Sequence, residues 1–238
     1  MERIRGLSTP SPGRGISPKT MRYLLVIAAK LERIVLFLGR LGGWVVVPLI
    51  GIIIFDILTR KFYWSQQLIS NSWAFGYISS GHLQDWEWHL HTVLFLMVLG
   101  YTYVRNRHVR VDLVREGLPP RAQAWIEFLG CLVFLIPFTI LLLYLTWPFV
   151  ERAWIYDEQS QSFTGLKHRW IIKSFLLPGF FLALMAGVAT FLRSIVYLFG
   201  SKTLRETAEL NAITENHSKT PIHVEETVPD EGQSGGTQ

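Results

Sequence analysis

Charge and cysteine are both scarce in this sequence. Charged residues make up 17 % of its 238 residues, whereas soluble proteins carry about a quarter, which argues against an ordinary soluble enzyme. The single cysteine, Cys131, lies in an apolar stretch, so no disulfide framework or multi-cysteine metal site can form within the chain. The sequence also lacks a Walker-type phosphate loop, a dinucleotide fingerprint and a nucleophile elbow. We therefore predict that the chain is not an enzyme.

The chain is basic, with 23 Lys and Arg against 18 Asp and Glu, a net charge of +5. A nucleic-acid-binding protein would carry such an excess as a basic stripe on a folded polar domain. Here the basic residues cluster at the ends of long uncharged stretches. We therefore predict no nucleic-acid partner, and we interpret the basicity as a determinant of membrane orientation, with membrane lipids as partners.

Half of the residues are hydrophobic, and most of these lie in four stretches bounded by charged residues. A helix needs about 20 apolar residues to cross the hydrocarbon core of a bilayer. The predicted spans cover about residues 38–58, 86–104, 126–148 and 172–195. None of them alternates polar and apolar residues as a barrel strand does. We therefore predict an all-α membrane protein with four transmembrane helices.

The positions of Lys and Arg predict the orientation of these helices. Seventeen of the 23 lie before the first span, after the second or after the fourth, and six lie in the two other loops. The positive-inside rule then places both termini in the cytoplasm and two longer loops with interfacial aromatic residues in the periplasm. We expect a multi-pass protein of the bacterial inner membrane.

Composition divides the chain into three parts. Residues 1–30 are predicted to be a disordered basic cytoplasmic segment, residues 31–200 the four-helix membrane domain, and residues 201–238 a polar, mostly disordered cytoplasmic tail. We find no internal repeat, which argues against a complete secondary transporter.

Tryptophan is concentrated in and beside the two outer loops, which hold seven of the nine. Indole rings favour the headgroup layer of a membrane, but tryptophan is also a preferred anchor in protein interfaces. Both interpretations stay open. For the second, the candidate residues for docking a binding protein are Trp64, Trp73, Trp154, Asp157 and Glu158.

Ionisable residues at the span ends are the other candidate functional groups. Asp56 and Arg60 are four residues apart, so they can either pair on one helix or contact another subunit. Glu87, at the start of the second span, is expected to have a partner on another helix, because an isolated buried carboxylate is costly. Spans one, three and four contain no histidine, so we predict no haem, other cofactor or metal site.

Three motifs, in order, resemble a known family. The second span begins Glu87-Trp88-His89 and is followed by the basic turn 108–112, which reads HVRVD. The other two motifs are Asp56 with Arg60, and the series Gly165, Leu166, Arg169, Trp170, Ile172, Lys173 and Pro178. Over about residues 31–199 the chain resembles the small membrane subunit (Q-type small permease) of tripartite ATP-independent periplasmic (TRAP) transporters.

The resemblance implies a scaffold, or stator, for a large membrane transport subunit that carries the solute and sodium sites. It also implies docking of a periplasmic solute-binding protein and sodium-driven symport of a solute, in this family usually an organic carboxylate. The candidate subunit-contact or structural residues are Asp56, Arg60, Glu87, His89, Arg110, Asp112, Arg169, Trp170 and Lys173. The alternatives are a membrane anchor of a redox complex and a small stand-alone channel or exporter.

Overall fold

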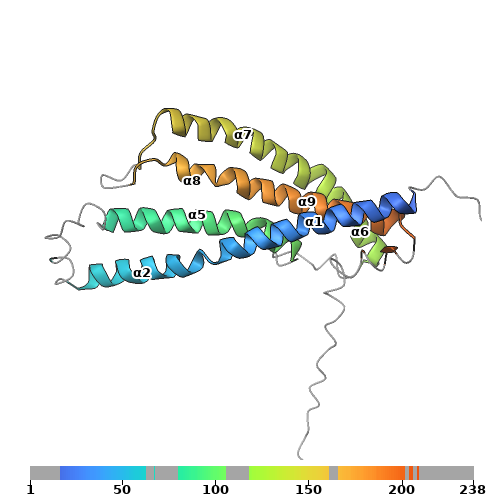
Figure 1. Cartoon of the computed structure of the whole chain (residues 1–238), viewed down its shortest axis with the longest axis horizontal. Coiled ribbons are helices and arrows are strands. Elements are labelled where there is room, and N and C mark those ends of the chain that lie inside the picture. Colours follow the sequence, from blue (N-terminus) through green and yellow to red (C-terminus); the bar gives the residue numbers. More distant parts are fainter. Residues whose placement is uncertain are drawn as a thin grey trace, which may run out of the picture.

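The computed structural model describes residues 17–62, 67, 80–105, 118–160, 166–201, 204, 205 and 208. Within these ranges the regular structure is entirely helical, as predicted. The elements are α1 (Pro18–Gly43), α2 (Val46–Lys61), α5 (Ser80–Val104), α6 (Pro120–Leu129), the π-helix η1 (Gly130–Leu135), α7 (Ile136–Ile155), α8 (Trp170–Ser174) and α9 (Leu176–Phe199). Figure 1 shows the long helices running along one common direction.

Among the described residues, three helical stretches are long and apolar enough to cross a membrane: Pro18–Lys61, Pro120–Ile155 and Trp170–Phe199. They contain the predicted spans 38–58, 126–148 and 172–195 and extend beyond each of them. The predicted span 86–104 lies within α5. That helix is not among the three, because its first half carries Asp85, Glu87 and several other polar side chains that lower its mean hydropathy.

Helix α1 begins much earlier than the sequence analysis placed the first span. Residues 18–30, assigned there to a disordered segment, are helical. The reason is a stripe of buried residues seven apart, Met21, Ala28, Val35 and Gly42, which packs against α5 and α9. Ser17 caps the helix by accepting a hydrogen bond from the Thr20 amide.

A short turn at Trp44–Val45 separates α1 from α2 and produces the bend between the two helices in Figure 1. In this turn the Trp44 amide donates to the Leu41 carbonyl at 3.1 Å, a tighter pattern than that of an α-helix. The cause is Pro48, which has no amide hydrogen and whose ring clashes with the carbonyl four residues earlier. The first predicted span is therefore two helices.

The predicted third span also departs from regular α-helix. The six residues of η1 form π-helical turns directly before Pro137, where the wider turn accommodates the missing amide and the proline ring. Pro148 is retained inside α7. The Thr139 hydroxyl donates to the Leu135 carbonyl at 2.7 Å, which satisfies a polar side chain inside the apolar stretch.

Helix α9 lies at the centre of the bundle and packs against α1, α5, α6 and α7; Figure 1 shows it between α5 and α7. Its buried face is rich in small residues, including Gly179, Ala183, Ala186 and Gly187. Small residues allow helix backbones to approach closely in a membrane. A Cβ atom at Gly100 of α5 would lie 2.8 Å from the Leu182 carbonyl oxygen, so this contact needs glycine.

Most apolar side chains of the spans point away from the bundle. Only 17 %, 11 % and 33 % of the most apolar windows of the three stretches are buried within the chain. The exposed side chains include Ile50 and Ile54 on α2, Phe134 on η1 and Phe138 on α7. The chain therefore presents a large apolar exterior to lipid or to another membrane protein.

Candidate functional site

The predicted site residues that the structure describes gather at one end of the bundle. We call it the loop end, and define it by the last turn of α2, the first turns of α5, the last turn of α7 and α8, which lie together at the left of Figure 1. The opposite, terminal end is formed by the starts of α1 and α6 and the last turn of α9, which meet in a core that includes Met21, Ala124 and Val196.

At the loop end, Asp56 and Arg60 form an ion pair on α2. Arg60 Nη2 lies 2.6 Å from Asp56 Oδ2, and Arg60 Nε donates to Oδ1 at 3.1 Å. The Asp56 side chain is 7 % exposed, so the guanidinium neutralises a buried carboxylate. With its amide oxygen facing the guanidinium, Gln84 of α5 accepts from Arg60 Nη2 at 2.6 Å. The pair therefore also links α2 to α5.

Glu87 and His89 lie on the first turns of α5. The His89 ring contacts the Asp85 carbonyl oxygen of its own helix. Glu87 is half-buried, and within the described part of the chain its carboxylate has no ion-pair partner on another helix, contrary to the expectation for this residue. Its neighbour Trp88 is 73 % exposed. These side chains are available to another protein.

The connection between α7 and α8 is held by hydrogen bonds along its described residues. The Arg169 amide donates to the Glu158 carbonyl at 3.0 Å, and His168 Nδ1 lies 2.7 Å from Asp157 Oδ1. Asp157 and His168 both have positive φ, of 42° and 62°, a conformation that these residue types adopt more readily than most. The pair thus joins the two residues of positive φ in this connection.

Side chains fix this connection to the helices on either side. Lys173 of α8 forms an ion pair with Glu158, and its ammonium lies 4.0 Å from the centroid of the Phe149 ring on α7. The rings of Trp154 and Trp170 meet edge to face, with centroids 4.3 Å apart. These contacts bring together four of the predicted residues: Glu158, Lys173, Trp154 and Trp170.

The connection also touches α5, because the Leu166 amide donates to Asp85 Oδ2 at 2.8 Å. Asp85 was not among the predicted residues, although its acidic side chain at the start of an apolar span was a signal. Trp154 stays 60 % exposed and Asp157 is also exposed. The loop end thus presents a fixed surface that combines an aromatic ring with a charge.

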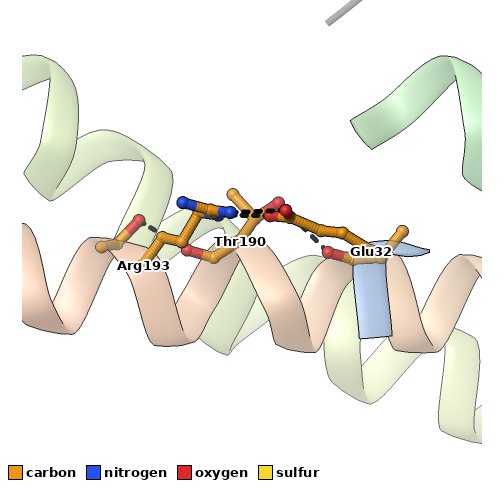
Figure 2. A network of polar contacts seen from close by, with 5 residues as sticks. Glu32, Thr190 and Arg193 are labelled. Atoms are coloured by element: carbon orange, nitrogen blue, oxygen red, sulfur yellow. Dashed lines mark hydrogen bonds and ion pairs between the residues drawn. The ribbon is translucent and has the colours of Figure 1, made fainter. Parts of the chain in front are cut away.

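An ion pair between two helices, α1 and α9, was not predicted from the sequence. Arg193 of α9 donates through Nε and Nη2 to both carboxylate oxygens of Glu32 on α1. Figure 2 shows the guanidinium facing the carboxylate, with Thr190 on the same side of α9. The Arg193 and Glu32 side chains are 7 % and 17 % exposed. The signal was present in the sequence, since Glu32 is the one acidic residue between positions 18 and 43.

Four predicted residues, Trp64, Trp73, Arg110 and Asp112, lie outside the described residues. Across the described ranges, no three His, Cys, Asp or Glu side chains are grouped so as to hold a metal ion. Three described pairs, Asp56 with Arg60, Glu158 with Lys173 and Glu32 with Arg193, hold helices and the α7–α8 connection in position. Such an arrangement suits a rigid membrane scaffold that binds other proteins.

The sequence matches a family model described as tripartite ATP-independent periplasmic transporters, DctQ component, over residues 49–196. This segment runs from α2 into the last turn of α9 and includes all of the described loop-end residues. No curated protein and no solved structure matches the chain.

Proposed function

Because the chain belongs to the DctQ family, the small permease component of TRAP transporters, we propose that it is the fixed scaffold on which the large subunit of such a transporter works. The DctQ component of TRAP systems works with a large DctM subunit and a DctP binding protein. Our proposal is that this chain packs beside DctM in the inner membrane and helps to dock DctP at the loop end.

The observation that carries the scaffold role is the contrast between the interior and the exterior of the bundle. Inside, an ion pair between α1 and α9, a hydrogen bond from Arg60 of α2 to Gln84 of α5 and close glycine contacts hold the helices in one arrangement. Outside, the spans expose most of their apolar surface. A rigid bundle with a broad apolar exterior is suited to lateral packing against a larger membrane protein.

We further propose that α5 crosses the membrane as well, which gives four spans with both termini in the cytoplasm. Its 25 residues would reach about 37 Å at 1.5 Å per residue, more than the hydrocarbon core requires. Its polar first turns would then lie in the headgroup layer at the loop end. The excess of Lys and Arg near the terminal end supports this orientation.

For docking of the binding protein, we propose the surface made by Trp154, Asp157 and the connection behind them. Exposed tryptophan beside charged groups is typical of interface anchors. The contacts of Glu158 with Lys173 and of Asp157 with His168 hold this surface in place before binding, which lowers the entropy cost of association. An organic carboxylate as solute and sodium as coupling ion remain proposals from the resemblance.

The scaffold role can be tested by co-expressing the tagged chain with a DctM large subunit from the same organism and purifying the complex in detergent. We expect the large subunit to copurify, and we expect cells that lack this chain to lose solute uptake although the large subunit is still made. Undiminished uptake in that deletion, or solute flux through liposomes that contain this chain alone, would contradict the proposal.

A further inference from the structure

An open groove of about 570 Å³ lies at the terminal end, between the start of α1 and the residues that follow α9. Its walls include Lys19, Arg22, Leu25 and Val26 of α1, and Ser201 and Leu204. We propose that this groove binds an anionic phospholipid, with the phosphate at Lys19 and Arg22 and the adjoining part of the lipid along Leu25, Val26 and Leu204.

The charge of the groove favours an anion. Lys19 and Arg22 are exposed, and neither has an acidic partner in the part of the chain that the structure describes. None of the described residues that line the groove is acidic. Glu32, the one acid of α1, is already paired with Arg193. Both cations are therefore available to a phosphate.

A third cation lies beside the groove. Arg205, next in sequence to Leu204, donates from Nε to the Gly200 carbonyl at 3.0 Å and from Nη2 to the Leu198 carbonyl at 3.3 Å. It thereby satisfies carbonyl groups at the end of α9. Its positive charge adds to the potential that attracts an anion to this end of the bundle.

The apolar part of the lining distinguishes a lipid from a free anion. Inorganic phosphate would need the cations alone, whereas Leu25, Val26 and Leu204 offer a wall for hydrocarbon. Val26 is 52 % exposed, and Tyr23 and Ile27 beside it on α1 are 70 % and 48 % exposed. A basic and apolar helix face of this kind is typical of segments that lie in a membrane interface.

The groove also lies at the depth at which a headgroup is expected. The stretch Trp170–Phe199 has 30 residues and measures about 45 Å, close to the thickness of a bilayer with its headgroups. Ser201 follows the end of this stretch directly. Under the proposed orientation this is the cytoplasmic leaflet, where anionic lipid attracts basic residues.

The groove lies outside the family match, because none of its lining residues falls within positions 49–196. It is therefore a feature of this chain rather than of the matched segment. The proposal depends on the chain spanning a membrane, and not on its role in transport, so its failure would leave the scaffold role untouched.

The test uses the full-length chain, purified and delipidated in a neutral detergent, with lipid binding measured by native mass spectrometry. We expect phosphatidylglycerol to bind, and phosphatidylcholine at the same concentration to bind far less. The double variant Lys19→Gln/Arg22→Gln should lower the apparent affinity for phosphatidylglycerol by at least about tenfold, because each basic contact contributes about 1 kcal/mol. The conservative variant Lys19→Arg/Arg22→Lys should keep most of the binding, which separates loss of charge from misfolding.

The matched control is Lys30→Gln/Arg33→Gln, which removes two exposed basic residues from the same helix away from the groove. It should retain full binding, and an equal loss in both double variants would overturn the site. Equal binding of phosphatidylcholine would overturn the role of charge. Competition by millimolar inorganic phosphate or glycerol phosphate as strong as that by lipid would overturn the assignment to a lipid.

Discussion

Glu32 on α1 and Arg193 on α9 are separated by 161 residues in sequence, yet both carboxylate oxygens of the first accept hydrogen bonds from the second. The pair joins the first helix of the chain to the last long helix. Both side chains are largely buried. Removal of one of them leaves the other charge buried without a partner, whereas replacement of both by apolar side chains leaves no buried charge.

Removal of one member of this pair should be strongly destabilising. We expect Glu32→Gln to lower the free energy of unfolding by about 3–5 kcal/mol, because the Arg193 charge then stays buried and unpaired. The double variant Glu32→Met/Arg193→Met should recover most of that loss. Denaturant titration in detergent micelles measures both, with the exposed Arg40→Gln as control. A double variant as unstable as the single one would show that the pair does more than neutralise its own charges.

Gly42 should be intolerant of a larger residue. A Cβ atom there would lie 2.3 Å from the Cβ of Met97 on α5, so Gly42→Val must push α1 away from α5, at a cost of about 1–3 kcal/mol. Gly51 of α2 has no atom within 4 Å of an added Cβ, which makes Gly51→Val the matched control. Thermal unfolding of the two purified variants distinguishes them, and equal melting temperatures would contradict the packing described for α1.

Arg60 should stabilise the contact between α2 and α5 more than the adjacent Lys61 does. Arg60→Gln removes the cation beside the buried Asp56 and the contact with Gln84. We expect a loss of about 1 kcal/mol, which is less than a buried charged hydrogen bond contributes, because the Arg60 side chain is 45 % exposed and solvent screens its charge. The exposed Lys61→Gln is the control. A melting temperature unchanged by Arg60→Gln would show that the pair does not tie the helices.

Glu87 tests the scaffold role itself. Its half-buried carboxylate has no ion-pair partner within the described ranges, so we expect Glu87→Gln to reduce copurification of the large subunit by about tenfold, equivalent to 1.4 kcal/mol. The chain itself should stay as stable as the wild type. Glu151→Gln, at an exposed acid of α7, serves as control, and normal copurification of the Glu87 variant would contradict a contact there.

The helical architecture and much of the loop end followed from local patterns. Long uncharged stretches predicted the apolar helices, and the spacing of Asp56 and Arg60 allowed the pair that the structure shows. The start of α1 at Pro18 was missed because its apolar stripe is interleaved with Lys and Arg, so composition resembled a disordered segment. A test for heptad spacing would have found Met21, Ala28 and Val35.

Contacts between residues far apart in the sequence were harder to predict than the helices. Nothing near Glu32 indicates Arg193 as its partner, because the pairing depends on how α1 crosses α9. The turn at Trp44–Val45, in contrast, could have been inferred from Pro48. The backbone approach of Gly100 to Leu182 arises from the packing of α5 on α9, which one sequence does not reveal.

The central position of α9 bears on how the protein is made. Helices emerge from the ribosome in chain order, and α9 comes after every other long helix that it contacts. A nascent chain truncated before residue 176 could still pack α1 against α5, but it would lack the helix that joins α7 to both of them. Final assembly must therefore wait for the end of translation, and such truncated chains should be ready targets for membrane proteases.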